Sequence, residues 1–481
     1  MDFLSLEYGA FLLSLTGIYW LVPSMTVRLL LLLTASLFFY SLLQLRFVWL
    51  LVVNIGVNLA LGQQIYRQTG RSRRVWVMGG IAYNLLLLLI FKYIPFLATT
   101  AGNATGWPGA FVFADWARQN IVTPVSISFF AFEMIAYLVN VARGQAPAQD
   151  VLSFAVYETL FVKMRAGPIV RYQDFLPQLQ LPRWPQTLDL VEGVWLMAVG
   201  VTKKALMADN LGRFVDLSLE NMERGGSWDL WLVLVAYGLQ IYGDFSGYID
   251  MARGSALLLG FRLPQNFDFP YFATSIADFW RRWHITLGNW VRDYLYIPLG
   301  GSRQGTLVTC GNLLVVMTLV GIWHGANWGF IIWGIWHGFA LALHRLWRDV
   351  VTVLPERPPF WPTWWGQSLA LVVTQGVVLV GWLPFRLPNL TDTGLMLSRL
   401  WGKSADPQYA LKVYVEAMGL SFAQIAILMA GAIAVMAVAY RCDRAKLHLA
   451  PVYKMALVPL ALYAAVLLSP SQTVPFIYFD F

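Results

Sequence analysis

The sequence predicts an all-α, polytopic membrane protein. Of its 481 residues, 58% are hydrophobic and 12% are charged, against about 25% charged residues in a typical soluble domain. The mean hydropathy is +0.58. The chain has 22 Trp and 21 Tyr, and many lie near the ends of apolar runs, as in an interfacial aromatic belt. This composition excludes an ordinary soluble enzyme and favours a chain that crosses the bilayer many times.

Apolar runs near spanning length recur along the chain, about 11 to 13 of them at the usual ~20 residues each. The short runs 47–62 and 308–323 are expected to be tilted, partial or re-entrant helices. The first run is expected to be a retained span, because Met1-Asp2-Phe3 lacks the basic start of a cleavable signal. The runs cover residues 4–22, 26–43, 47–62, 75–98, 121–141, 151–170, 188–207, 229–249, 308–323, 327–345, 367–385, 417–440 and 452–469.

Basic residues predict the orientation of the chain. Arg67, Arg71, Arg73 and Arg74 cluster after the third run, and the positive-inside rule places them in the cytoplasm. The N-terminus and the loop 99–120 are then expected outside. We assign the net charge of +8 to orientation rather than to nucleic acid, because no basic patch stands in a soluble segment.

The segment 272–303 predicts an amphipathic helix on the cytoplasmic surface, ended by Gly300-Gly301. Its apolar residues recur at spacings of three and four, while Asp278, Arg281 and Arg282 lie on other faces. Those charges are too many for a spanning helix. The apolar positions are Ile276, Phe279, Trp280, Trp283, Leu287, Trp290, Val291 and Leu295.

His324 is the first candidate for chemistry, because a titratable imidazole inside an apolar run is costly to bury. A neutral imidazole can take the proton of a hydroxyl as that oxygen attacks an acyl carbonyl. The indoles of Trp323 and Trp328 could wall a tunnel, and Gly325 permits a close approach. The alternative, interhelical hydrogen-bonding by His324, stays open.

Two further histidines are weaker candidates. His284, in the amphipathic segment, is either a contact to the acyl donor or a solvated interfacial residue. His337 lies 13 residues after His324, and an unbroken helix would separate the two by about 20 Å. Direct contact between them therefore needs a break in the helix, so packing or a hydrogen bond elsewhere is favoured for His337.

Other polar breaks in the apolar sequence have competing interpretations. Asp244 and Asp250 close the run 229–249, where they either line a polar cavity or cap a helix end. The loop or strand-like segment 166–169, beside Arg165 and Arg171, either binds a phosphate or carboxylate or anchors the chain. No metal site is expected, because no histidine, cysteine or carboxylate grouping has zinc-ligand spacing, and the two cysteines suggest no disulfide framework.

A series of short motifs runs along the chain in a fixed order. They are Ala166-Gly167-Pro168-Ile169-Val170-Arg171, Asp244-Phe245-Ser246-Gly247-Tyr248, Asp250-Met251-Ala252, Phe261-Arg262-Leu263-Pro264-Gln265-Asn266-Phe267, Asp278-Phe279-Trp280-Arg281-Arg282-Trp283-His284, the run from Arg292 to Gly301, Trp323-His324-Gly325-Ala326, and Pro475-Phe476-Ile477-Tyr478-Phe479. Together these motifs strongly resemble the membrane-bound O-acyltransferase family, in particular its bacterial alginate O-acetylation branch, and the resemblance is densest from 120 to 345. Lys163, Arg165 and Arg253 depart from the family, which has mostly small or apolar residues at these positions.

The resemblance implies a single transmembrane domain over 1–481, with partial or re-entrant helices around a central tunnel and a core at about 120–345. His324 would be the catalytic histidine, and His284 would mark the cytoplasmic side of the tunnel as a second catalytic residue. The residues expected to bind substrate or line the tunnel are Asp244, Ser246, Asp278, Arg281, Arg282, Trp323, Asn327, Trp328 and His337.

The implied function is O-acetylation of an exported polysaccharide such as alginate, at the bacterial inner membrane. The resemblance implies no bound cofactor, and acetyl-CoA or another acyl thioester as donor substrate. The implied partners are membrane lipid, an extracytoplasmic SGNH-hydrolase-like acyltransferase and the polysaccharide export machinery, with no nucleic acid. Two alternatives stay open: D-alanyl transfer to teichoic acid, and a non-enzymatic transporter, although we find no internal repeat of the kind transporters show.

Overall fold

A computed structural model describes residues 1–180, 184–353, 363–470 and 475–477. Every regular element in these ranges is a helix, which confirms the predicted all-α class. The chain forms two compact units, and each is described by itself. The first consists of Met1–Met197 and Ile249–Pro264, and the second of Ala198–Tyr248 and Gln265–Phe481.

Among the described residues, 6 helical segments are long and apolar enough to cross a membrane. The chain is therefore a multi-pass membrane protein. The short apolar runs at 47–62 and 308–323 both fall in helices that reach spanning length, because polar residues extend each run at its ends. The segments are Met25–Arg67, Gly70–Thr105, Thr306–His324, Trp364–Arg386, Phe422–Arg444 and Pro451–Leu468, with a shorter apolar helix at Ile127–Ala142.

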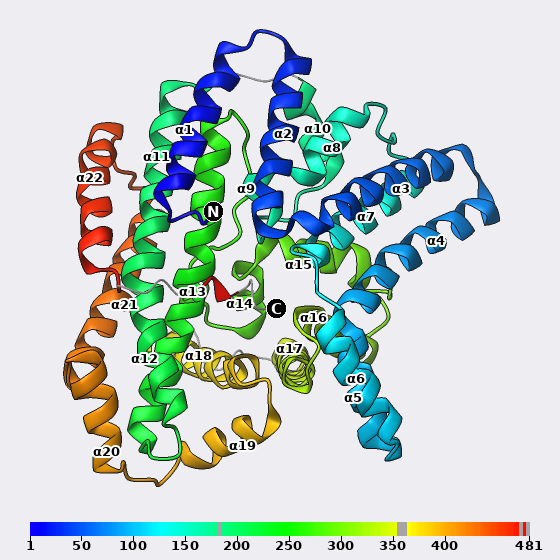
Figure 1. The fold of residues 1–481 in the computed structure, drawn as a ribbon. Helices are drawn as coiled ribbons and strands as arrows, with labels where there is room; N and C mark the ends of the chain where they lie inside the picture. Colours follow the sequence, from blue (N-terminus) through cyan, green and yellow to red (C-terminus); the bar gives the residue numbers. More distant parts are fainter. Residues whose placement is uncertain (181–183, 354–362, 471–474, 478–481) are drawn as a thin grey trace. The chain divides into compact units, whose positions relative to one another are not determined.

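The first unit is built from the N-terminal helices (Figure 1). The side chain of Ser5 caps α1 by accepting from the backbone N–H of Tyr8 at 3.1 Å. Gly106, with φ 70°, ends α5 so that α6 folds back against it. The helices are α1 (Leu6–Leu21), α2 (Met25–Gln44), η1 (Leu45–Phe47), α3 (Val48–Arg67), α4 (Gly70–Leu88), η2 (Leu89–Tyr93), α5 (Ile94–Thr105), α6 (Pro108–Asn120), α7 (Ile127–Ala142), α8 (Val151–Thr159), α9 (Phe161–Met164), α10 (Tyr172–Gln180) and most of α11 (Thr187–Thr202).

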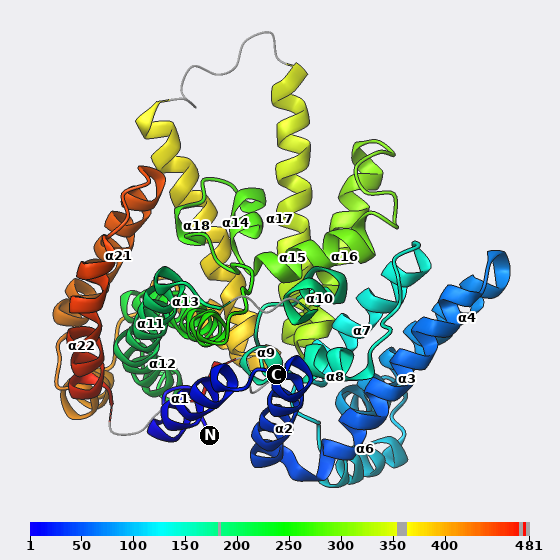
Figure 2. The same cartoon turned by 90° about the horizontal axis from the view of Figure 1, so that it is seen from above.

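The second unit holds all five histidines and begins at the end of α11. The long α13 (Ser227–Leu258) starts in this unit, and its last residues belong to the first. Figure 2 gives a second view of these helices. The others are η3 (Lys203–Ala208), α12 (Asp209–Glu220), η4 (Pro270–Phe272), α14 (Ile276–Arg282), α15 (Ile285–Val291), η5 (Arg292–Tyr296), α16 (Thr306–His324), α17 (Trp328–Val353), α18 (Trp364–Arg386), α19 (Leu390–Arg399), α20 (Pro407–Tyr409), η6 (Ala410–Met418), α21 (Phe422–Arg444) and α22 (Pro451–Leu468).

The prediction of one amphipathic helix over 272–303 is wrong. The segment is divided into η4, α14, α15 and η5, and its helical part stops at Tyr296. The break between α14 and α15 falls at Trp283-His284, where His284 adopts left-handed backbone angles of φ 46° and ψ 54°. An unbroken helix does not permit that conformation. The apolar periodicity therefore spans two separate short helices, α14 and α15.

Helices α16 and α17 form a tight antiparallel hairpin, and both views show them side by side (Figures 1 and 2). Glycines allow the close approach. A Cβ atom on Gly321 would lie 2.2 Å from the carbonyl oxygen of Phe330, and one on Gly334 would lie 2.4 Å from that of Met317. Backbone therefore packs directly on backbone, as at small-residue contacts between membrane helices.

Candidate active site

His324 is the last residue of α16, beside the turn into α17. Its side chain is buried at 4% exposure, and three aromatic rings surround it. The ring centroids of Trp323, Trp333 and Phe385 lie 4.9, 5.0 and 5.1 Å from that of the imidazole. These rings fix the position of the imidazole beside the turn, and a general base needs a fixed position.

The side chain of Phe330 packs directly against the backbone of Gly325. A Cβ atom there would lie 2.2 Å from the ring of Phe330, so this glycine makes room for the first turn of α17. Asn327 starts that helix, and its side-chain oxygen lies 3.4 Å from the backbone N–H of Gly329. Trp323 is buried, whereas Trp328 is 45% exposed, so the two indoles lie in different environments.

His337 comes close to His324 because the helix between them is broken. The turn at 325–327 reverses the chain, and both imidazoles pack on the indole of Trp333, at 5.0 and 5.1 Å between centroids. His337 is fully buried and also packs on Trp280 at 5.0 Å. Neither of its ring nitrogens has a hydrogen-bond partner within the described part of the chain. Of the two roles favoured for His337, the structure therefore shows packing and not a hydrogen bond to another described residue.

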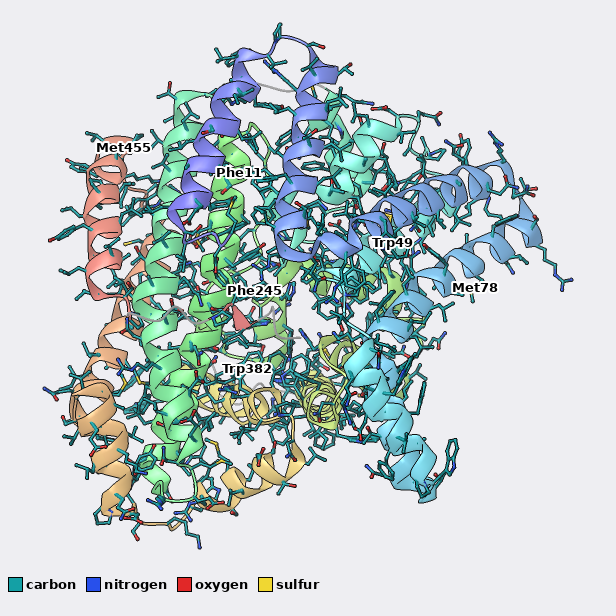
Figure 3. The ribbon with its side chains drawn as sticks, in the orientation of Figure 1. Phe11, Trp49, Met78, Phe245, Trp382 and Met455 are labelled. Carbon is teal, nitrogen blue, oxygen red and sulfur yellow. The ribbon has the colours of Figure 1, made fainter. Side chains whose placement is uncertain are left out.

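The rings around His324 and His337 belong to one aromatic cluster, which we define as Trp280, Trp283, Trp333, Trp382 and Phe385. Trp382, labelled in Figure 3, lies on α18 and packs on Trp283 at 5.0 Å and on Phe385 at 5.4 Å. Trp333 packs on Phe385 at 5.3 Å. The cluster therefore joins α14, the helix that precedes His284, to the hairpin that carries His324.

His284 lies at the break after α14 and is 1% exposed, so the alternative of a solvated interfacial histidine is wrong. Its Nδ1 lies 3.3 Å from Oδ1 of Asn266. The ring of Phe245, labelled in Figure 3, lies edge-on at 4.8 Å. Burial lowers the pKa of His284 to about 3, so the imidazole is neutral at physiological pH.

Asp244 lies inside α13 and not at a helix end, so the prediction that it caps a helix is wrong. Its Oδ1 pairs with Nζ of Lys204 at 2.8 Å, and Lys204 also pairs with Asp209 at 2.7 Å. Its Oδ2 accepts from the backbone N–H of Ile477 at 2.9 Å. Ser246, two residues on, is buried, and its hydroxyl has no hydrogen-bond partner among the described residues.

The charged residues of α14 form an ion-pair group of their own. Asp278 pairs with Arg282 at 2.8 Å and with Arg281 at 3.4 Å, and the Arg281 side chain is 74% exposed. Partial burial lowers the pKa of Arg282, but the hydrogen bonds that its guanidinium donates to Tyr440 and Asp278 outweigh burial and raise it. Of the three residues only Arg281 is exposed, while Asp278 and Arg282 are half-buried and Phe279 on the same helix is buried.

Sequence reasoning missed a buried ion pair in the first unit. Nζ of Lys163 lies 2.5 Å from Oε2 of Glu133, and Oε1 of the same carboxylate accepts from the backbone N–H of Val170 at 3.2 Å. Glu133 therefore supplies the carboxylate for the loop 166–170, where a bound anion was one expectation. The available signal was the charged residues inside apolar runs: Glu133 in 121–141, and Glu158, Lys163 and Arg165 in 151–170.

Comparison with known proteins identifies the family of this chain. A model of the membrane-bound O-acyltransferase family matches residues 32–369. The probable alginate O-acetylase of Azotobacter vinelandii is 39% identical over 78% of this chain and 72% of its own length. The peptidoglycan O-acetyltransferase of Helicobacter pylori is 32% identical over 76% and 72%.

A more distant relative is the teichoic acid D-alanyltransferase of Bacillus subtilis, 25% identical over 68% of this chain and 82% of its own length. The family match includes Glu133, Lys163, Asp244, His284 and His324. The buried imidazoles, the aromatic cluster and these similarities lead to one assignment: the chain is an acyltransferase that belongs to the membrane-bound O-acyltransferase family.

Proposed function

We propose that this protein takes an acetyl group from a cytoplasmic thioester, acetyl-CoA in the simplest case, for O-acetylation of an exported polysaccharide. The observation that carries the proposal is the buried His324, held in apolar surroundings at the turn of the α16–α17 hairpin. The names of the relatives at 39% and 32% identity support acetyl as the acyl group. They do not agree on one polymer, so the proposal extends to exported polysaccharide as a class, with alginate as one member.

The proposed reaction needs one base and one carbonyl. His324 takes the proton of the acceptor hydroxyl while that oxygen bonds to the thioester carbonyl carbon. The carbon–sulfur bond then breaks, the sulfur leaves with its electron pair, and a proton restores the thiol. The acceptor gains the acetyl ester, and His324 returns to its neutral form. His284 is proposed as the residue that contacts the donor on the cytoplasmic side.

The proposal is tested in membranes that carry the chain, supplied with radiolabelled acetyl-CoA and the polysaccharide-producing machinery. We expect His324→Ala and His324→Gln to insert normally and to lower acetylation by about 10²–10⁴-fold, since a general base contributes about that much. The exposed His448 provides a control, and His448→Gln is expected to keep parental activity. Near-normal acetylation by His324→Gln would exclude the catalytic role.

The D-alanyl alternative rests on the 25% identical relative, and the transporter alternative on the polar residues within apolar runs. Labelled D-alanine in place of acetate identifies the first. Unchanged polymer acetylation with lost solute flux identifies the second.

The partner is proposed on size and reach. The described residues form helices and short connections, and no soluble domain is evident that could hold a long polymer. We infer that an extracytoplasmic SGNH-hydrolase-like acyltransferase relays the acetyl group at the outer face of the bacterial inner membrane. Its docking surfaces would include the segment 99–120, which was expected to be a loop but folds into the end of α5 and the whole of α6. The purified chain in lipid, given acetyl-CoA and polysaccharide alone, is then expected to acetylate little polymer. Efficient transfer by the single chain would show that no relay is needed.

A further inference from the structure

Asn266 connects two backbone segments, its own and residues 284–286, at the break before α15. Its side chain is fully buried. Oδ1 accepts from the backbone N–H of Thr286 at 3.0 Å and from the Thr286 hydroxyl at 2.9 Å, and it lies 3.3 Å from Nδ1 of His284. The backbone carbonyl of Asn266 accepts from the N–H of Ile285 at 2.9 Å. One residue therefore binds three successive positions of the chain, 284 to 286.

The orientation of this amide follows from the chemistry of its partners. A backbone N–H can only donate, so the atom that faces Thr286 must be the carbonyl oxygen and not the NH2 group. Nδ2 has no hydrogen-bond partner among the described residues, and a flipped amide would place two donors against each other. Since Oδ1 can only accept, the nitrogen of His284 that faces it must carry the proton.

At the same break the backbone of His284 adopts a strained conformation. His284 is not glycine, yet its φ is 46°, a backbone conformation that is strained for a residue with a side chain. Phe245 fixes the ring from the side of α13 at 4.8 Å. Such strain persists where the surroundings define one geometry, and here Asn266 and Phe245 define both the place of the ring and its proton.

We propose that Asn266 is a positioning residue that holds His284 as the neutral Nδ1–H tautomer and thereby presents Nε2 as the nitrogen that acts on substrate. The tautomer is a property of the resting protein. Its consequence for acyl transfer rests on the proposed function, in which His284 contacts the donor.

The charged groups near His284 come from three elements. On α14, Arg282 is paired with Asp278 at 2.8 Å. On α13, Asp244 precedes the contacting Phe245 and is paired with Lys204 of η3 at 2.8 Å. These charges are paired, and burial is the main cause that lowers the pKa of His284. A carboxylate at position 266 would lie directly against the Nδ1 atom, because Oδ1 of Asn266 is 3.3 Å from it.

The first experiment measures the tautomer without any acyl transfer. The full chain is labelled with ¹⁵N-histidine, reconstituted in lipid and studied by solid-state NMR at neutral pH, with His284→Gln to assign the signals. We expect His284 to carry its proton on Nδ1 in the parent, and the Nε2–H form to appear in Asn266→Ala. Asn84 is equally buried and bonds to Asn58 on another helix pair, so Asn84→Ala is expected to leave the tautomer unchanged. An Nε2–H parent, or an unchanged tautomer in Asn266→Ala, would overturn the proposal even if acetylation proceeds.

The second experiment measures acetylation against pH in Asn266→Asp, which keeps the acceptor and adds a carboxylate. The new charge favours the imidazolium, so the acid limb of the profile is expected to move to higher pH. Asn266→Ala is expected to lower turnover by about 10- to 100-fold, a part of the value of a general acid or base, and to add nothing in a His284→Gln background. An unmoved acid limb or full additivity would reduce Asn266 to a structural role. Absence of acetylation by the parent protein, together with the expected NMR result, would count against the proposed function alone.

Discussion

Glu133 and Lys163 show how single charged residues are accommodated inside apolar helices. Glu133 is the one charged residue of its apolar run, whereas Lys163 shares its run with Glu158 and Arg165. The fold brings Glu133 and Lys163 to 2.5 Å. The neighbouring Glu158 is fully buried, and its carboxyl oxygens have no hydrogen-bond partner among the described residues. Lys163 is therefore the ion-pair partner of Glu133 and also interacts electrostatically with the buried Glu158.

We therefore expect Lys163→Met to lower the free energy of unfolding by about 3–5 kcal/mol, because it leaves Glu133 buried without its partner. Adding Glu133→Gln should recover part of that loss. Thermal and urea unfolding of the protein in detergent would measure both. Arg118 and Asp115 form an exposed pair at 2.6 Å, so Arg118→Met is the matched control and should cost about 0–1 kcal/mol. Equal losses in the two variants would contradict this account.

The burial of His284 predicts acid sensitivity. Burial lowers its pKa to about 3 in the folded protein, from about 6.5 in an unfolded chain. Between these values the unfolded chain binds a proton that the folded chain does not, so stability from neutral His284 is present above pH 6.5 and is lost as pH falls toward 3. We expect the fall in melting temperature from pH 7.5 to 5 to be smaller in His284→Gln than in the parent. The exposed His448 serves as control, and the same flattening in His448→Gln would argue against the assignment.

The α16–α17 hairpin carries the site at the scale of elements. The turn after His324 reverses the chain, and glycines on both helices allow their backbones to touch. Trp333, His337 and the start of α17 are thereby brought against His324 from positions that a straight helix would carry away. The position of the His324 imidazole therefore depends on the spacing of the two helices.

Gly334→Ala should consequently disturb both the fold and the chemistry. Its Cβ would fall 2.4 Å from the carbonyl oxygen of Met317, and overpacking of this kind typically costs about 1–3 kcal/mol. We expect a lower melting temperature and reduced acetylation, because the helices must separate beside His324. A Cβ on Gly311, in the partner helix α16, meets nothing within 4 Å, so Gly311→Ala should be neutral or slightly stabilising. Parental stability and activity in Gly334→Ala would show that the close approach is not required.

At the scale of the whole molecule, the chain is a multi-pass acyltransferase whose family match ends at residue 369. The last described residues nevertheless reach the site region of the second unit. Ile477 donates to Asp244, and the ring of Phe476 lies 4.5 Å from Nζ of Lys204 and 5.2 Å from the ring of Tyr248. Residues beyond the family match thus belong to the packing of α13.

Orientation in the bilayer is the prediction at this scale. We expect single cysteines placed in 67–74 and in 272–303 to be shielded from an impermeant thiol reagent in intact cells, and cysteines at the N-terminus and in 99–120 to react. Cys310 and Cys442 are replaced first, since they are the 2 native cysteines. Lysed cells supply the control for reactivity. Labelling of 272–303 from outside would exclude a cytoplasmic donor site in this segment.

The sequence by itself determined the membrane class, the all-α fold and the family, and it singled out His324 as a candidate for chemistry, because composition, apolar run length and short motifs are local properties. Only the tertiary structure decided what each polar residue contacts. It placed Asp244 inside a helix against Lys204, broke the segment 272–303 at His284, and assigned Asn266 to that histidine. The reason is physical. Buried charges and imidazoles are stabilised by partners far away in the chain, and helical periodicity records the buried face of a helix but not the partner opposite it.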